Sequence, residues 1–234
     1  MNVSLVSESN EFSPSHFEQL VKDRYSCRAF LQKQIPRALI ERILAIAQRS
    51  PSDCNIQPWK VAIVSGERLE RLRVAMYERS MAGVPMAPDI PPIPQYTGVF
   101  QERRRVCGWS LYSTLGIERG DRAASYQQAM ENFRFFGAPY LAIVTSHESL
   151  GTRGALDCGA YMASFLLAAQ SLGVATVPQA SIAQRADVIR EQLGLPGDDH
   201  VVYGIAFGWP DGDHRVNSFR TPRAPLEEVV TFFN

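Results

Sequence analysis

Apolar residues recur every three to four positions in eight stretches of the chain, which is the spacing of a helix with one buried face. In one of these stretches, for example, Leu39, Ile43 and Ala47 fall on the same side of a helix. The stretch at 154–172 is apolar on every face, which favours a helix inside a core or between subunits. The pattern predicts helices at about 13–23, 36–49, 66–80, 98–115, 121–136, 154–172, 181–194 and 226–233.

Four shorter apolar runs, rich in β-branched residues, predict strands at 59–64, 139–145, 174–177 and 201–209. Strands interspersed with helices in this way indicate an α+β fold, in which helices flank a central four-stranded mixed sheet. No G-x-G-x-x-G follows any of these runs, and no G-x-x-x-x-G-K-[ST] is present. The sequence therefore predicts neither a dinucleotide-binding Rossmann domain nor a P-loop.

Residues 81–97 interrupt the periodic pattern, because they contain five prolines and few regularly spaced apolar positions. This composition favours extended backbone. The two helical stretches that follow are rich in large aromatic side chains, so residues 81–136 are predicted to form an insert that covers a ligand as a lid. The first 12 residues are polar and unpatterned. We expect a flexible arm at 1–12 and a single domain at 13–234.

The composition is that of a globular protein without net charge, with 45% hydrophobic residues and 24 residues of each charge sign. This balance provides no field that would attract nucleic acid or an anionic membrane. The chain does not begin with a signal-like pattern, and polar residues interrupt its most apolar stretch. The four cysteines lack disulfide or zinc spacing, which indicates reduced thiols. A cytoplasmic protein without a nucleic-acid or membrane partner is expected.

Side chains suited to acid–base or metal chemistry are scarce. The four histidines are isolated and neither H-E-x-x-H nor G-x-S-x-G occurs, so we predict no metal site and no hydrolase. Ser52 has no candidate base nearby in the sequence, which favours a hydrogen-bonding turn serine over a nucleophile. A chain this poor in catalytic groups suits an enzyme whose bound cofactor carries the chemistry.

Two motifs point to the kind of cofactor. In the first, Arg24–Phe30 (RYSCRAF), an extended backbone places Arg24, Ser26 and Arg28 on one side, where guanidinium and hydroxyl donors suit a phosphate. The second motif, Pro51–Trp59 (PSDCNIQPW), follows about one helix later. In this order and spacing, the pair resembles the FMN-dependent nitroreductase family, in which R-x-S-x-R-x-F is followed by P-S-x-x-N-x-Q-P-W. The resemblance extends from Arg24 to the C-terminus.

The resemblance implies roles for individual residues. Arg24 and Ser26, with Tyr25 between them, would hold the FMN phosphate, and Arg28 would lie toward the pyrimidine end of the flavin, where a positive charge stabilises the reduced ring. A basic pair near the C-terminus completes the phosphate site in the family, and the choice between Arg220 and Arg223 stays open. Further flavin contacts are implied for Pro178, Gln179, Ala180 and Gly208, and, from the other subunit, for Pro51, Ser52, Asn55 and Gln57. An ordinary glycine at the end of a strand is a nearly equal interpretation of Gly208.

The activity implied by the family is the reduction of nitroaromatic or quinone acceptors by NADH or NADPH, with FMN as the bound cofactor. The reductant and the acceptor would use one pocket in turn, which is a ping-pong mechanism. Family members are homodimers with FMN sites at the interface and exchanged C-terminal segments, a role that the helices at 154–172 and 226–233 fit. Alternatives are reductive dehalogenation or flavin breakdown on the same fold, or a non-catalytic FMN-binding protein.

Two positions are candidates for contact with a small aromatic substrate. Cys54 lies inside the second motif, although nothing in the sequence activates it as a catalytic thiol. Three consecutive arginines begin at Arg103, and on a helix they point in different directions. Helical spacing places Arg103 beside Val99 and Val106, so we hypothesise that Arg103 binds the carboxylate of an acceptor such as nitrobenzoate. The plain alternative is that all six arginines of the insert are solvated.

Overall fold

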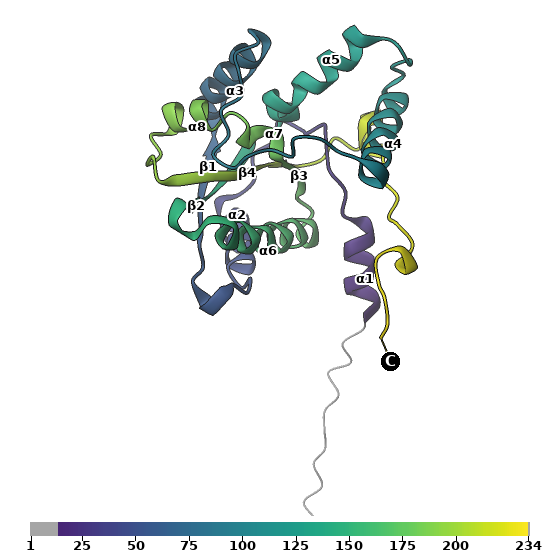
Figure 1. Cartoon of the computed structure of the whole chain (residues 1–234). Coiled ribbons are helices and arrows are strands. Elements are labelled where there is room, and N and C mark those ends of the chain that lie inside the picture. The colour runs from purple at the N-terminus through teal and green to yellow at the C-terminus, as the bar shows by residue number, and fades with distance from the viewer. Residues whose placement is uncertain (1–13, 234) are drawn as a thin grey trace, which may run out of the picture.

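A four-stranded sheet lies at the centre of the computed structural model, which describes residues 14–233 (Figure 1). Its strands are β1 (Trp59–Ser65), β2 (Tyr140–His147), β3 (Ala175–Gln179) and β4 (Asp199–Gly208), in the order β1-β2-β4-β3. All three neighbouring pairs are antiparallel, and the parallel direction appears in the described residues only as an isolated bridge between Ser26 and Thr176. The expected α+β fold is confirmed, while the mixture of strand directions is confined to that bridge. The arm predicted at 1–12 lies outside the described residues.

Helices cover both faces of this sheet (Figure 1). Side chains alternate between the faces of a strand, so Leu141 and Ile143 of β2 join one hydrophobic core while Ala142 and Val144 join the other. The first core packs against α3 (Gly66–Met81), α7 (Ala180–Ala183) and α8 (Ala186–Leu193), and the second against α2 (Arg37–Ala47) and α6 (Gly151–Ser171). β2 is buried along nearly its whole length because it contributes side chains to both cores.

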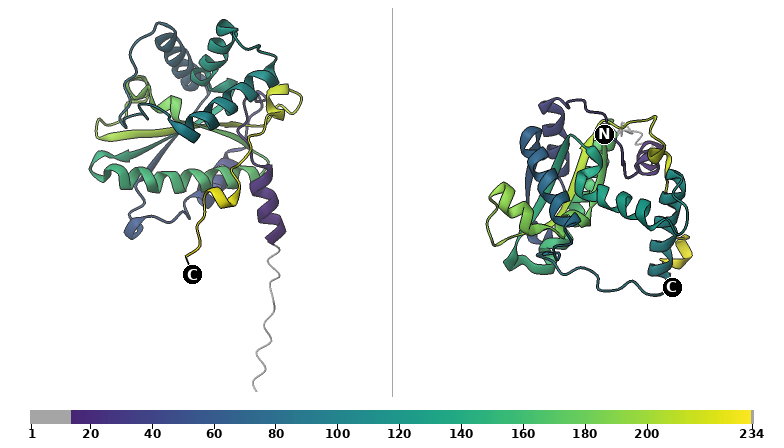
Figure 2. Two further views of the ribbon diagram at one scale, coloured as in Figure 1. Left: turned by 45° about the vertical axis from the view of Figure 1, so that its right-hand side comes forward. Right: turned by 90° about the horizontal axis from the view of Figure 1, so that it is seen from above.

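Two helices stand apart from these layers (Figure 2). They are α1 (Pro14–Asp23), which lies beside the C-terminal segment, and α4 (Gly98–Leu115). No residue of α4 is buried, and even its large apolar side chains are open to solvent: Phe100 is 63% exposed and Val99 is 50% exposed. An 18-residue helix with such exposed apolar side chains is one that another surface would be expected to cover.

The structure corrects three helix predictions. The helix expected at 181–194 begins at Ala180 and is broken into α7 and α8, because the chain turns at Arg185 to bury that side chain completely. The helix expected at 121–136 ends as α5 (Arg122–Met130), and a 3₁₀ segment follows in which Phe135 and Phe136 have positive φ values. The helix expected at 226–233 is wrong: only the 3₁₀ turn Leu226–Glu228 forms, since the β-branched and aromatic residues that follow favour helix weakly.

The proline-rich segment has no regular structure, yet it is firmly attached to the fold. The amide of Ala87 donates to the carbonyl oxygen of Gln184 at 3.0 Å. The carboxylate of Asp89 accepts from the Val201 amide at 2.8 Å and pairs with Arg190 at 3.0 Å. β3 pairs with β4 only along residues 204–208, and Val201 lies outside that range. Asp89 thus accepts from a backbone amide of β4 that β3 does not pair, and it protects this part of the sheet edge.

No helix within residues 14–233 combines the length and apolar character that a membrane span requires. The same part of the chain contains no cluster of three or more histidine, cysteine or acidic side chains arranged to hold a metal ion.

Candidate functional site

The first motif forms an extended segment that runs alongside β3. The amide of Cys27 donates to the Thr176 carbonyl oxygen at 2.9 Å, and Phe30 pairs with Pro210 as an isolated antiparallel bridge. This pairing sends Cys27 and Phe30 into the core, and it leaves Arg24, Ser26 and Arg28 on the open side. The three side chains share one side, as the sequence predicts, but strict alternation does not hold, because Tyr25 also lines the open side and Phe30 is buried.

These three side chains line a pocket of about 720 Å³, a size suited to a small ligand. We call it the arginine pocket. The pocket lies where α1, the C-terminal segment and the second half of α6 come together. Its lining includes five cationic side chains and no carboxylate: Lys22, Arg24, Arg28, Arg220 and Arg223 are joined by Val21, Tyr25, Ser26, Ala163, Leu166, Leu167, Pro178, Phe219 and Thr221. A concave surface of this charge is suited to an anionic ligand.

Arg24 and Arg223 bring like charges together in this pocket. Burial lowers the pKa of Arg24 from its ordinary value, and the nearby Arg223 guanidinium lowers it further. Within residues 14–233, the hydrogen bonds of Arg223 go to Thr221 and to the Pro222 carbonyl oxygen, and none reaches a carboxylate. Arginine side chains carry a positive charge in proteins. An anion between these two would therefore relieve a repulsion that the described part of the protein leaves uncompensated.

The other two arginines are held against aromatic rings. Arg220 lies 3.9 Å from the centroid of Tyr25 and donates to the carbonyl oxygens of Asn217 and Phe219. Burial raises the pKa of Tyr25 to about 12, with the charge of Arg220 opposing the shift, so this phenol stays neutral and supports the stack. These contacts fix the plane of the Arg220 guanidinium.

Arg28 lies over the rings of Phe136 and Phe219, at 5.8 and 5.6 Å from their centroids. It donates to the Ser26 carbonyl oxygen at 3.1 Å, and burial lowers its pKa from the ordinary value. The Phe136 ring reaches this position through a tight turn, where Phe136 has a φ of 51°. Arg28 is thus a fixed positive charge in a largely apolar setting, which strengthens its effect on any ligand nearby.

Asn217 is a site-shaping residue that no sequence motif indicates. Its side-chain oxygen accepts from the Arg28 amide at 2.9 Å, and its nitrogen donates to the carbonyl oxygens of Ala29 and Asp211. The buried Asn217 therefore ties the first motif to the C-terminal segment that carries Arg220 and Arg223. The signal is invisible in sequence, because these partners are separated by 189 positions.

The segment Pro178–Ala180 forms another wall of the site. Pro178 lines the arginine pocket and Ala180 begins α7, where the first amides of a helix lack intrahelical partners. Gln179 is buried, and its Nε2 donates to the Asn132 carbonyl oxygen at 2.9 Å. Its Oε1 has no hydrogen-bond partner in residues 14–233. A buried acceptor without a partner is costly, which suggests that this segment is built around a ligand with polar edges.

The second motif is a well-defined loop that lies outside the pocket. The hydroxyl of Ser52 accepts from the Gln57 amide at 2.9 Å, and the Asp53 amide donates to Asp157 of α6 at 3.1 Å. Within the loop, Cys54, Asn55 and Gln57 all have positive φ values. Strain of this kind costs about 1–3 kcal/mol per residue and is typical of functional segments.

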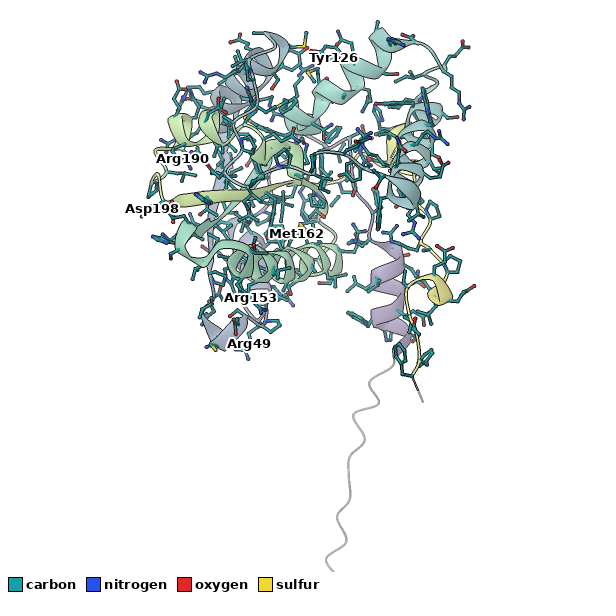
Figure 3. All side chains as sticks on the ribbon, in the orientation of Figure 1. Arg49, Tyr126, Arg153, Met162, Arg190 and Asp198 are labelled. Carbon is teal, nitrogen blue, oxygen red and sulfur yellow. The ribbon has the colours of Figure 1, made fainter. Side chains whose placement is uncertain are left out.

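None of the residues 51–57 lines the arginine pocket. Figure 3 shows Arg49, just before the loop, beneath α6 in the view, to the left of α1 and the C-terminal segment and apart from them. Cys54 is exposed, and as a member of this loop it too lies away from the pocket.

Two other predicted site residues, Gly208 and Arg103, make contacts that do not involve the pocket. A Cβ atom at Gly208 would come within 2.8 Å of Pro139 and 3.2 Å of Phe30, so close packing explains this glycine without a ligand. The guanidinium of Arg103 pairs with Glu228 of the C-terminal segment at 2.7 Å. Arg103 does not line the arginine pocket.

The fold and the pocket define an α+β protein with a cationic pocket whose charge suits an anionic ligand. The sequence profile of the Nitroreductase family matches residues 21–209. The chain is 34% identical over 220 residues to the Nitroreductase NfnB of Mycolicibacterium smegmatis, with 92% of each chain covered. It is 32% identical over 220 residues to a 4-nitrobenzoate reductase of a Nocardioides species, covering 92% of this chain and 89% of the relative.

The fold also matches a solved structure, the FMN-dependent nitroreductase NfnB from Mycobacterium smegmatis in complex with NADPH. The TM-score is 0.90, and the match covers 94% of this chain and 99% of that one. This chain belongs to the nitroreductase family, and the resemblance that the two motifs suggested is confirmed.

Proposed function

We propose that the protein is an FMN-dependent oxidoreductase that uses NADH or NADPH to reduce nitroaromatic or quinone acceptors. The pocket with five cationic side chains and no carboxylate carries this proposal, because it matches the charge of a flavin phosphate. The two relatives described above, named as a nitroreductase and a 4-nitrobenzoate reductase, support this activity over dehalogenation or flavin breakdown.

The residues present fit FMN. Arg24, Ser26 and Arg223 surround the position for the phosphate, with Arg223 favoured over Arg220 because it is the one that repels Arg24. Arg220 instead positions Tyr25 through their stack. When bound, FMN supplies the electron-transfer chemistry, and the protein supplies binding and electrostatics.

The remaining residues would contact the ring. Arg28 is the positive charge suited to the pyrimidine edge, where reduction places negative charge. Pro178, Gln179 and Ala180 would lie along the ring, offering the unpaired Gln179 oxygen and the first amide of α7. Because the sequence lacks a Rossmann unit, we infer that the nicotinamide and the acceptor occupy one pocket in turn.

We also propose a homodimer in which each subunit completes the other's site. Three features support it: the strained second motif lies outside the pocket, no residue of α4 is buried, and α6 exposes an apolar side chain. That side chain is Leu156, which is 63% exposed. The C-terminal segment adds Phe232 and Phe233, which are 79% and 93% exposed. The partner's Pro51, Ser52, Asn55 and Gln57 would then approach the flavin, as the family resemblance implies.

We further infer that residues 13–234 act as one domain, with 81–136 as the insert over the site. A cytoplasmic location is part of the proposal, supported by the four free thiols and by the need for reduced nicotinamide.

The activity is tested on the purified holoenzyme. Its flavin absorbance should bleach on anaerobic addition of NADH or NADPH and return when nitrobenzene is added, and double-reciprocal plots should be parallel. Intersecting plots would contradict the shared pocket. Bound FMN that neither nucleotide bleaches would instead favour a non-catalytic flavin-binding protein.

Replacing Leu156 with arginine should dissociate the dimer. A buried leucine contributes about 1.5–3 kcal/mol, and a two-fold interface loses this twice while gaining two desolvated charges. Analytical ultracentrifugation would measure the change in mass. Val74→Arg is the matched control, because Val74 is similarly exposed, at 52%, on the opposite layer in α3. A dimer that tolerates Leu156→Arg as well as the control would remove α6 from the proposed interface.

A further inference from the structure

A second cavity, of about 600 Å³, lies between the proline-rich segment and α7. We call it the proline groove. One wall is the segment Pro88–Tyr96, and the other contains Ala180, Ala183 and Val202. The lining combines apolar side chains with the polar Gln95, Gln101 and Gln184, and its charged member is Arg104 of α4. Nothing in the flavin site described above uses this arginine.

Arg104 differs from the other arginines of the insert in its partners. Arg103, Arg105 and Arg134 each pair with a glutamate, and Arg119 lies over the ring of Trp109. Within residues 14–233, Arg104, Arg119 and Arg122 have no carboxylate partner, and of these three only Arg104 lines the proline groove. The groove therefore contains a positive charge that the described part of the protein does not neutralise.

The orientation of Arg104 suits recognition of a planar anion. Its guanidinium lies over the Tyr96 ring, 5.4 Å from the centroid. A guanidinium stacked on an aromatic face keeps its N–H groups in its own plane, so they remain available to a carboxylate in bidentate geometry. The proline and isoleucine side chains beside it offer flat apolar walls for an aromatic ring.

The walls of the groove are fixed by the fold, although the segment is irregular. The Ala87 amide donates to Gln184, and the buried Arg185 donates to the carbonyl oxygens of Val84 and Pro85 at 2.7–3.1 Å. Asp89 holds the next part of the segment against β4. Such a preformed site orders little on binding and so loses little affinity to entropy.

The position of the groove relates it to the proposed flavin site. Ala180, the first residue of α7, lines the groove. Pro178, two residues earlier at the end of β3, lines the arginine pocket. A ligand in the groove would thus lie next to the segment proposed to run along the flavin ring.

We propose that Arg104 determines specificity by binding the carboxylate of an aromatic acceptor whose ring lies in the proline groove. This inference rests on the proposed reductase function and deepens it by naming arylcarboxylates, such as nitrobenzoates, as a preferred substrate class. It replaces Arg103, which Glu228 already neutralises, as the arginine of that role.

The test compares the FMN-loaded wild type with Arg104→Gln and Arg104→Lys, using kcat/KM for 4-nitrobenzoate and for nitrobenzene. Loss of a charged bidentate contact should lower the ratio of the two constants about 10- to 100-fold in Arg104→Gln. Lysine should restore part of the preference, since it keeps the charge without the fork. Arg105→Gln is the control, because Arg105 is adjacent but pairs with Glu102.

Binding is measured separately, by calorimetric titration of benzoate into the oxidised holoenzyme without nucleotide. Wild type should bind benzoate at least about tenfold more tightly than Arg104→Gln. An unchanged benzoate affinity together with an unchanged ratio would overturn the proposal. Arg104→Gln could instead raise the KM for NADPH, leave the KM for NADH unchanged and leave the ratio of kcat/KM for the two nitro compounds unchanged. In that case the groove binds a nucleotide phosphate, and the proposal is also wrong. If neither nitro compound is reduced, the reductase function fails, while the benzoate titration still decides the role of Arg104.

Discussion

Replacing Arg24 and Arg223 together with alanine should abolish FMN binding while the protein still folds. Each guanidinium supplies charge-assisted hydrogen bonds to a phosphate, which are worth about 1.5–3 kcal/mol apiece, so each single variant should lose roughly 10- to 100-fold in affinity. Titration of FMN into apoprotein, followed by quenching of flavin fluorescence, measures the loss.

Without FMN, removing Arg24 or Arg223 should not destabilise the protein. Since Arg24 and Arg223 repel each other without an anion, removing either should leave the melting temperature of the apoprotein unchanged or slightly higher. The rise in melting temperature on adding FMN should shrink, because ligand stabilisation follows affinity. Arg37→Ala serves as the control, since Arg37 is 89% exposed and paired with Glu41. An unchanged FMN affinity in the double variant would place the phosphate elsewhere.

Replacing Arg185 with methionine should destabilise the protein by about 2–4 kcal/mol, a large share of the roughly 5–15 kcal/mol that holds a domain folded. Arg185 is fully buried and donates four hydrogen bonds to the carbonyl oxygens of Val84 and Pro85. Methionine fills similar space but leaves both carbonyl groups without these donors. Urea unfolding monitored by circular dichroism gives the free energy of unfolding.

A structural consequence distinguishes this loss from general destabilisation. The proline-rich segment should detach first, so limited proteolysis under native conditions should cut within 84–96 in Arg185→Met and not in the wild type. Arg79→Met is the matched control. Arg79 pairs with Asp187 and Glu191 but is 38% exposed, so its removal should cost no more than about 1 kcal/mol. Equal losses in the two variants would contradict the anchoring role of Arg185.

Features that depend on local spacing could be predicted from the sequence. Period-two alternation predicted that Arg24, Ser26 and Arg28 share one side of an extended segment, and all three line the pocket, although Tyr25 lines it too. Helical periodicity located α2, α3 and α6 to within a few residues, because a helix with a buried stripe must repeat its apolar positions. The paired motifs also identified the family.

Contacts between residues far apart in the sequence could be seen only in the folded structure. Asn217 joins the first motif to the C-terminal segment, and Phe136 reaches Arg28 through a turn with positive φ. Helical spacing could place Arg103 and Arg104 on different sides of α4, but it could not show that Glu228 neutralises one while Tyr96 supports the other. Periodicity specifies the direction in which a side chain leaves its own element. The identity of its neighbours depends on how the chain returns from far away, and that is fixed by packing of the whole fold.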